Sequence, residues 1–376
     1  MSAPIQADVI VVGGGIMGAA TAFFLRRRGV KVVLLERGLV GQQASGVNFG
    51  NVRRQGRFLP QLPLANRSRA IWGQLNELLG EDAEFIATGH VRVCFRAHEA
   101  DRLEAHATAV REYGLELEIL SANELRARYP FLAPGVVAGS LSPLDGHANP
   151  RLAAPAFGRA AARAGALVVE NAEVLAIEKP GDDFLVETAS AIYRAPIVQI
   201  SAGAWGGTLS ARFGEPVPIV ARGPQMAVTE PMPYRITPVV GVLSDNEHEA
   251  IYFRQVKRGN IVWGGGWRGP AYPDIQRAHI DPMNTLRQFP MVTRIAPGLA
   301  QLRTIRTWSG IEGYLPDDIP IMGPSGKVSG LFYAFGFCGH GFQLGPGVGD
   351  TMAELIATGS TPIPLAPFHI SRFAGQ

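Results

Sequence analysis

A glycine-rich segment near the start of the chain has the residue types and spacing of a loop that cradles phosphates. Gly13, Gly15 and Gly18 follow a β-branched run over residues 8–12 and precede an apolar segment that predicts an amphipathic helix over 16–28. Such glycines permit a tight turn and bring backbone N–H groups close to a pyrophosphate at the start of a helix. The pattern therefore predicts a nucleotide-binding turn between a strand and a helix.

An acidic residue completes this motif. Glu36 lies 18 residues after Gly18, at the end of a second apolar run over 31–35 that predicts the next strand. A carboxylate at that place suits ribose hydroxyls and repels a 2′-phosphate, which favours NAD or FAD over NADP. The third nucleotide-facing element that the sequence predicts, 331–357, comes at the C-terminal end of the chain. This split arrangement favours FAD.

A second match to the same glycine pattern lies at residues 264–269. It runs into Pro270 and Pro273, so no helix can begin there and no anion site is expected. We interpret it as a turn at the end of a sheet.

The expected elements alternate between strands and helices at both ends of the chain and are mostly strands between them. Further helices are predicted over 64–80, 98–113, 151–164 and 347–357. The last of them comes after a predicted strand over 331–335 and a glycine-rich loop. Short strands around a turn at 180–183 are expected over 166–201, and 216–304 is rich in strands and proline. The predicted class is α/β, with a split Rossmann-like nucleotide domain (1–85, 145–215 and 305–376) and an inserted β-rich substrate domain (86–144 and 216–304).

Composition narrows the classes of function. The chain has 376 residues, is 47% hydrophobic and 18% charged, and carries a net charge of +3 with its basic residues scattered, which disfavours nucleic acid as a partner. Two cysteines and eight histidines without metal-ligand spacing predict neither a disulfide framework nor a metal site. No apolar run approaches the length of a membrane span. We expect a cytoplasmic protein, or one peripheral to the inner membrane.

Four segments together resemble the D-amino-acid-oxidase-type flavoproteins, among them glycine oxidase, sarcosine oxidase and the catalytic subunits of D-hydroxyproline dehydrogenase and opine oxidase. They are residues 11–18 with Glu36 and Arg37, 44–50, 201–205 and 336–345. Two stretches, 48–54 and 308–314, look closest to the hydroxyproline and opine group. The resemblance implies a bound FAD and hydride transfer from the Cα–H of an amino acid, giving an imine that is later hydrolysed.

The resemblance also implies the residues that contact the cofactor. The loop over 339–343 and the turn at Ser45 and Gly46 face the flavin in the family. The full implied set is Gly13, Gly15, Ile16, Met17, Gly18, Glu36, Arg37, Ser45, Gly46, Asn48, Val174, Ala202, Gly203, Trp205, Gly339, His340, Gly341, Phe342 and Gln343.

Four residues are candidates for the chemistry itself, and each has a structural alternative. Arg53 matches the arginine that holds the substrate carboxylate, unless residues 53–57 form a solvated basic stretch. Glu312 replaces a carboxylate-binding arginine of glycine oxidase and favours a cationic or secondary amine, unless it faces outward. Tyr252 closes the pocket or only packs. His340 contacts the flavin or only caps a helix. Cys338 is expected to be a packed side chain.

Two absences bear on the reaction. The family's flavin-tethering cysteine falls near Gly310, so FAD should be bound non-covalently, and the oxygen-activating lysine falls on 261–263, which has none. These features favour a dehydrogenase that passes electrons to a carrier or to partner subunits in a hetero-oligomer. The alternatives are a glycine- or sarcosine-type oxidase that produces hydrogen peroxide, a non-catalytic FAD subunit, and a pyridoxal-phosphate enzyme, for which no lysine lies in a phosphate-binding context.

Overall fold

A six-stranded sheet carries the glycine-rich loop in the computed structural model, which describes residues 3–375. The strand order is β22-β23-β13-β2-β3-β9, and every neighbouring pair is parallel except β22 with β23. All positions of β2 and β3 are buried, which explains their uninterrupted apolar runs. The strands are β2 (Val9–Val12), β3 (Val32–Leu35), β9 (Leu167–Val169), β13 (Ile197–Ile200), β22 (Ile321–Pro324) and β23 (Leu331–Phe335).

Four helices pack beside this sheet: α1 (Ile16–Arg27), α3 (Leu62–Gly73), α7 (Pro150–Arg163) and α10 (Gly341–Thr358). Helix α1 contacts both α7 and α10, and α10 also contacts α3. The predicted amphipathic character of α1 is wrong, because residues 16–25 are all buried. The helix lies between other elements on all sides, so its sequence has no polar stripe until the arginines of its last turn.

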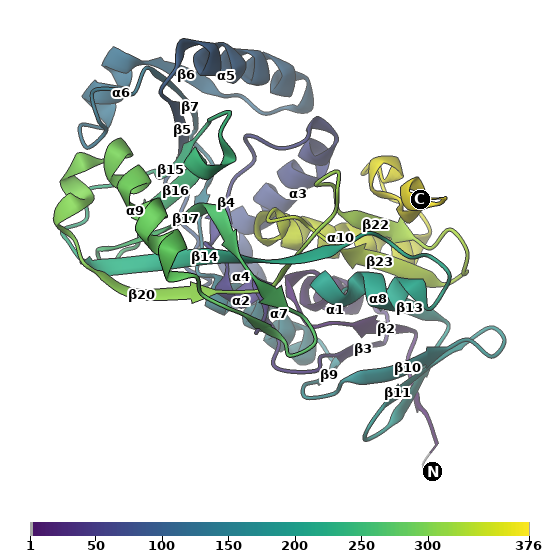
Figure 1. The fold of residues 1–376 in the computed structure, drawn as a ribbon. Coiled ribbons are helices and arrows are strands. Elements are labelled where there is room, and N and C mark those ends of the chain that lie inside the picture. The colour runs from purple at the N-terminus through teal and green to yellow at the C-terminus, as the bar shows by residue number, and fades with distance from the viewer. Residues whose placement is uncertain (1–2, 376) are drawn as a thin grey trace.

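A larger sheet is built from the middle of the chain (Figure 1). Its order is β20-β14-β17-β16-β15-β5-β7-β6, with β21 paired to β14. Its core includes the fully buried Phe253 and Trp263. The strands are β5 (His90–Cys94), β6 (Glu118–Ser121), β7 (Ala138–Ser142), β14 (Val220–Pro231), β15 (Val239–Val242), β16 (Ile251–Gln255), β17 (Asn260–Gly269), β20 (Thr304–Ser309) and β21 (Glu312–Tyr314); helices α5 (Ala97–Val110), α6 (Ala122–Arg128) and α9 (Pro282–Ile295) belong to the same part of the chain.

Smaller elements complete the fold. A four-stranded sheet has the order β1-β12-β11-β10, with the predicted turn at 180–183 between β10 and β11. Its strands are β1 (Ile5–Gln6), β10 (Val174–Glu178), β11 (Phe184–Thr188) and β12 (Ile192–Ala195). The remaining elements are the pairs β4 (Asn51–Val52) with β8 (Gly146–His147) and β18 (Ala271–Tyr272) with β19 (Arg277–Ala278), helices α2 (Ala44–Val47), α4 (Leu75–Leu79) and α8 (Gly206–Ala211), and 3-10 turns at Leu59–Gln61, Arg111–Tyr113, Gly203–Trp205, Glu247–Glu249, Pro297–Gln301, Ala366–Phe368 and Ile370–Phe373.

The predicted α/β class with a split Rossmann-like sheet is confirmed, since the six strands come from three separated parts of the chain. The predicted helix over 64–80 is two helices, α3 and α4, which meet at Gln74. The predicted helix over 347–357 begins six residues earlier, at Gly341. Its glycines suggested a loop, but Gly345 and Gly349 leave room for Ile16 and Ala20 of α1, so helix packing outweighs their low helix propensity.

The interpretation of the second glycine run as a turn is wrong. Residues 264–269 lie inside strand β17, where the pairing with β14 shifts register between Gly264 and Arg268. Gly265 and Gly266 have φ values of +118° and +59°, which glycine adopts without strain. The run is therefore a bulge within the larger sheet. No helix starts there, as predicted.

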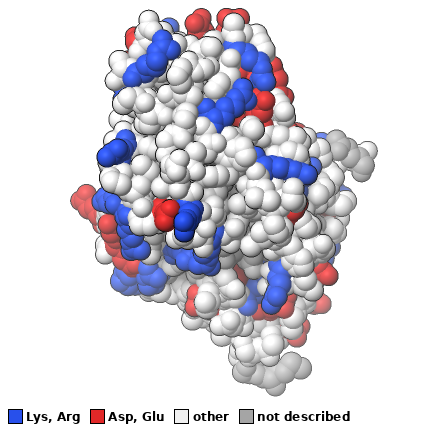
Figure 2. All heavy atoms as spheres, turned by 60° about the vertical axis from the view of Figure 1, so that its left-hand side comes forward, with Lys and Arg blue, Asp and Glu red and all other residues white. Residues whose placement is uncertain are grey.

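On the face in Figure 2, basic and acidic side chains are interspersed. Among residues 3–375, no helix combines the length and apolar character needed to cross a bilayer. The two large sheets also suit the two predicted domains, whose boundaries we retain as a proposal.

Candidate functional site

A cavity of about 580 Å³ lies between the two large sheets. Its walls include residues just after the carboxyl ends of β2, β3 and β13, and residues from β16 and β17 of the larger sheet. In the six-stranded sheet the chain order reverses between β2 and β13, and ligands of open α/β sheets bind at such a switch point. The cavity therefore lies where the topology predicts a binding site.

The glycine-rich loop forms one end of the cavity. Gly13 has φ +104°, and a Cβ atom on it would lie 2.6 Å from the carbonyl oxygen of Ser201. A Cβ on Gly18 would overlap the carbonyl of Gly13. Gly13 and Gly15 line the cavity, whereas Gly18 does not and serves the close packing of α1. A side chain at Gly13 or at Gly18 would therefore collide with the backbone, which explains why these two positions are glycine.

Glu36 is held rigidly beside this loop. One carboxylate oxygen accepts a hydrogen bond from Gly14 N at 2.7 Å, and the other accepts one from Gly38 N at 2.8 Å. Arg37 lies over the Trp205 ring, with its guanidinium carbon 3.7 Å from the ring centroid, and burial lowers its pKa against the opposing effect of nearby carboxylates. These three residues line the cavity with Val174, Ala202 and Gly203.

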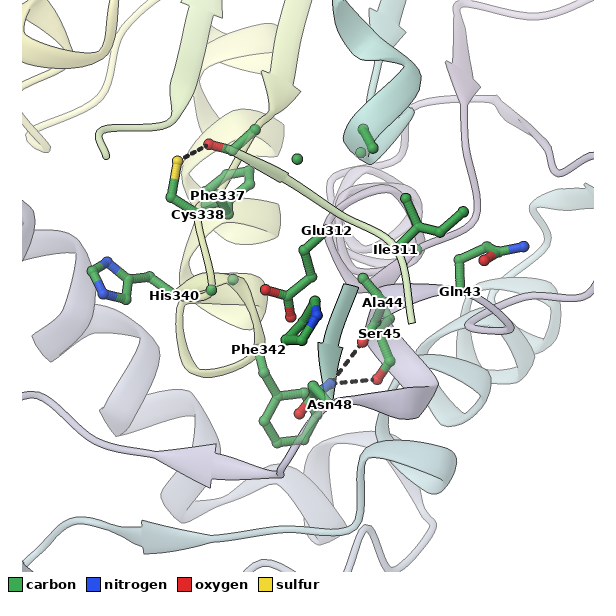
Figure 3. Close-up of a pocket in the computed structure, with 18 of the residues that line it drawn as sticks. Gln43, Ala44, Ser45, Asn48, Ile311, Glu312, Phe337, Cys338, His340 and Phe342 are labelled. Carbon is green, nitrogen blue, oxygen red and sulfur yellow. Dashed lines mark hydrogen bonds between the residues drawn. The ribbon is translucent and has the colours of Figure 1, made fainter. Parts of the chain in front are cut away.

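The turn that follows β3 approaches the start of α1. Ser45 Oγ accepts a hydrogen bond from Ile16 N at 2.9 Å, and Asn48 Nδ2 donates to the carbonyls of Ala44 and Ser45 at 3.0 and 2.9 Å (Figure 3). A Cβ on Gly46 would overlap the carbonyl of Gly41, so Gly46 allows the turn without lining the cavity. Ile16, Met17, Ser45 and Asn48 do line it.

His340 lies at the start of α10, but its side chain does not cap the helix. It occupies the N-cap position but makes no side-chain cap hydrogen bond, and its buried Nδ1 has no partner among the described residues. Burial lowers its pKa well below the usual range, and Arg57, Arg53, Arg268 and Arg92 lower it further. The ring is therefore neutral near pH 7. The alternative that His340 is only a helix cap is wrong.

The rest of this loop is fixed by packing. The Phe342 ring lies against Trp72 with centroids 5.1 Å apart, and Gln343 Nε2 donates to the carbonyl of Ala65 at 2.9 Å. Gly339, Gly341, Phe342 and Gln343 line the cavity. Cys338 Sγ donates to Gly336 O and accepts from Leu315 N, while burial raises its pKa to about 12, as suits a packed side chain.

The basic stretch after β4 is buried, so the alternative of a solvated stretch is wrong. Arg53 and Arg57 line the cavity, and Arg57 Nε donates to the carbonyl of Arg53 at 3.0 Å. Arg54 points away and pairs with the fully buried Asp145, which also accepts a hydrogen bond from the backbone N–H of Arg54 at 2.7 Å. Burial lowers the pKa of Arg53 and Arg57. Asp145 thus fixes the loop that presents two cations.

Glu312 lies in the cavity and not on the outer surface. Figure 3 shows it between His340 and the turn containing Ser45 and Asn48. Tyr314 donates a hydrogen bond from its hydroxyl to Glu312 at 2.8 Å. Burial raises the pKa of Glu312, and the Tyr314 hydrogen bond and the Arg268 charge oppose this rise. The alternative of an outward-facing glutamate is wrong.

Tyr252 both packs and lines the cavity. Its ring contacts Phe49 edge to face with centroids 4.6 Å apart, and burial raises its pKa to about 12. Its hydroxyl is therefore a neutral hydrogen-bonding group at physiological pH.

Sequence reasoning missed several residues of this wall. Arg268 lies within the glycine run at 264–269, which we interpreted as a turn, so recognising that run as a bulge would have pointed to it. Tyr314 lies in the stretch over 308–314, which also contains Glu312. His90 and Arg92 on β5 and Met226 on β14 line the cavity without a sequence signal.

The residues present fit an FAD. The buried, unpartnered His340 Nδ1, the tight glycine turn at Gly13 and Gly15 and the Glu36 carboxylate occur along one cavity. Gly310 lies against Val47, whose side chain a Cβ there would overlap, so a tethering cysteine has no room without movement.

Comparisons with known proteins agree with this geometry. Residues 8–355 match the family model described as "DAO: FAD dependent oxidoreductase". The chain is 31% identical to glycine oxidase of Geobacillus kaustophilus over 98% of each chain, and 26% identical to a subunit of opine oxidase from Rhizobium meliloti over 99% of each. It superimposes on L-proline dehydrogenase from P. horikoshii with a TM-score of 0.92 and 28% identity, covering 99% of this chain and 98% of that one.

Proposed function

The chain belongs to the FAD dependent oxidoreductase (DAO) family, and from that premise we propose that it oxidises an amino acid bearing a secondary or D-configured amine to the imine. D-hydroxyproline and opines are the leading substrates. The observation that carries this choice is the Glu312 carboxylate inside the cavity, hydrogen-bonded by Tyr314. A carboxylate there attracts a substituted ammonium group and repels a substrate carboxylate.

The cofactor would lie along the cavity in an extended form. Gly13, Gly15 and Glu36 would hold its pyrophosphate and ribose, while Ser45, Asn48 and the loop at His340 would face the flavin ring. When bound, FAD supplies the acceptor for the hydride that leaves the substrate Cα. We propose that it is held non-covalently, because both cysteines are buried and Gly310 abuts Val47.

The protein side chains orient the substrate and handle its protons. Arg53 binds the carboxylate, since a guanidinium offers two parallel N–H donors. Glu312 accepts a hydrogen bond from the amine N–H and so turns the amine and its Cα–H in one direction. Loss of the Cα hydride and of one N–H proton leaves the imine. Water hydrolyses an open-chain imine to an oxo acid and an amine, and it opens a cyclic imine to a single amino-substituted oxo acid.

We also propose that the enzyme is a dehydrogenase that delivers electrons to a carrier or a partner subunit. The relative from Rhizobium meliloti is named as one subunit of an opine oxidase, which supports a hetero-oligomer. The cavity wall formed by the described residues contains no lysine. Similarity to glycine oxidase supports a second candidate, an oxidase that reduces oxygen to hydrogen peroxide.

Turnover with an artificial electron acceptor tests the proposal. Proline derivatives, opines, D-amino acids, glycine and sarcosine are compared, and the oxo acid formed by imine hydrolysis is measured. Secondary-amine or D-amino acids should be the best substrates, and the reduced flavin should reoxidise slowly in air. Preference for glycine with fast reoxidation would establish the oxidase instead.

A further inference from the structure

Four arginines gather around His340 in the cavity wall. Arg53, Arg57, Arg92 and Arg268 all line the cavity, and none forms a salt bridge with a carboxylate in the part of the chain that the structure describes. Eleven other arginines form salt bridges in the described part of the chain, and several of these are exposed. Arg57 is buried and Arg53 and Arg92 are half-buried, so leaving these guanidinium groups unpaired costs free energy unless a ligand neutralises them. Arg268 is exposed and lines the same cavity.

The first group of cations lies on the side of the loop after β4. Nitrogens of Arg92 and Arg53 lie 2.6 and 3.3 Å from the position that a Cβ on Gly56 would take, so the two guanidinium groups converge there. Arg57 bonds to the carbonyl of Arg53 at 3.0 Å and of His340 at 3.4 Å. These three residues, which we call the Arg53 group, form one cationic wall of the cavity.

The second cation comes from another strand of the larger sheet, β17. Arg268 belongs to the bulge of β17, and its guanidinium carbon lies 4.6 Å from the centroid of the Tyr314 ring. Tyr314 in turn donates to Glu312 at 2.8 Å. Glu312 therefore has Arg268 close by on the side of β17, while the Arg53 group belongs to another part of the wall.

The charges of this end of the cavity are unbalanced. Glu312 is a half-buried carboxylate there, and Glu247 is an exposed one. His340 and Tyr252 are neutral near pH 7. One substrate carboxylate on the Arg53 group would leave Arg268 with Glu312 alone, while Glu312 is also needed by the substrate amine. A second anionic group on the substrate would satisfy Arg268.

We propose that the substrate is an imino-dicarboxylate, a secondary amine with a carboxylate on each of its two carbon substituents. The Arg53 group binds the carboxylate beside the reacting Cα–H, Arg268 binds the other, and Glu312 accepts the N–H between them. Arg268 is thus a specificity-determining residue. This inference rests on the proposed function and narrows it to the opine-like branch, excluding proline-like monocarboxylates as the best ligands.

Binding of unreactive analogues tests this inference without turnover. Oxydiacetate has an ether oxygen in place of the amine and two carboxylates, and methoxyacetate has the same ether and one carboxylate. Perturbation of the visible spectrum of the FAD-loaded enzyme reports their dissociation constants. Oxydiacetate should bind about 10- to 100-fold more tightly, because it gains charge-assisted hydrogen bonds to a second guanidinium. Equal affinities would overturn the proposal.

Variants locate the second anchor. Arg268→Gln should weaken oxydiacetate about 10- to 100-fold and change methoxyacetate by less than about 3-fold, and Arg268→Lys should restore part of the loss. Arg222→Gln is the matched control, because Arg222 also lies over Tyr314, at 5.7 Å, but does not line the cavity. Loss of both ligands to the same degree in a variant that retains its FAD would overturn the role of Arg268.

Turnover separates failure of this inference from failure of the proposed function. Iminodiacetate and sarcosine share a secondary amine and differ by one carboxylate. Preference for sarcosine would overturn the proposal that the substrate is an imino-dicarboxylate, but it would remain consistent with the proposed amine oxidation. Oxidation of neither these compounds nor any other amino acid would overturn the proposed function.

Discussion

Replacing Glu312 with glutamine removes the negative charge from the cavity while keeping the side chain's shape. In the wild type the ionised carboxylate accepts a hydrogen bond from the substrate amine, and a hydrogen bond to a charged group contributes about 2 kcal/mol. We therefore expect Glu312→Gln to lower kcat/KM for a secondary-amine substrate about 30-fold. The variant should bind FAD normally, because Glu36 and the glycine loop lie at the other end of the cavity.

The pH dependence identifies the group that acts. Burial raises the pKa of Glu312 above the 4.5 of an ordinary glutamate, so the carboxylate is protonated, and its attraction for the amine lost, as the pH falls through that raised value. The wild-type kcat/KM should decline there, and the Glu312→Gln variant should lack this decline. Tyr314→Phe removes a hydrogen bond that stabilises the ionised form, so it should move the decline to higher pH.

The assay is steady-state kinetics with an artificial electron acceptor, run across the acidic and neutral range for each variant. Glu247→Gln is the control, because Glu247 is an exposed carboxylate on the same wall and its removal should leave the profile unchanged. A Glu312→Gln enzyme that keeps the acidic decline and stays within about 2-fold of the wild-type efficiency would refute this assignment.

Three further outcomes follow from the same geometry. Arg53→Ala should lower kcat/KM by the equivalent of about 2–4 kcal/mol, chiefly through KM, because the substitution removes a charged anchor for the substrate. Steady-state kinetics at constant FAD content measure this loss, and an unchanged kcat/KM would refute the role of Arg53. Asp145→Asn should lower the free energy of unfolding by about 3 kcal/mol, because it leaves the buried Arg54 unpaired, whereas Asp183→Asn breaks an exposed pair and should cost less than about 1 kcal/mol; urea denaturation compares them. Acid precipitation should leave the yellow FAD in the supernatant, and a yellow pellet would show a covalent bond.

The FAD-binding half of the site could be predicted because it depends on local sequence. A buried strand, three spaced glycines and Glu36 determine the nucleotide end through contacts within about 30 residues of chain. The same local reasoning found the strands at 31–35 and 331–335 and the turn at 180–183. Packing against neighbouring helices determines how much of α1 is buried and where α10 begins. For these two features the polarity pattern and the helix propensities of the sequence were misleading.

The substrate half could be predicted only in part. Arg53 and Glu312 were found through a family resemblance, whereas Arg92 and Arg268 come from strands β5 and β17, which the larger sheet holds on opposite sides of β15 and β16. No local pattern indicates which face of a strand meets a cavity built from distant segments. Arg268 was hidden by the wrong interpretation of its glycine run, because a bulge and a turn use the same residues.

The most direct test of the central claim is an anaerobic titration of the FAD-loaded enzyme with a secondary-amine amino acid, without any electron acceptor. We predict that one equivalent of substrate abolishes the yellow absorbance of one equivalent of flavin and yields one equivalent of the imine or of the oxo acid formed from it by hydrolysis. A flavin that stays oxidised with every secondary-amine and D-amino acid tried would contradict the account.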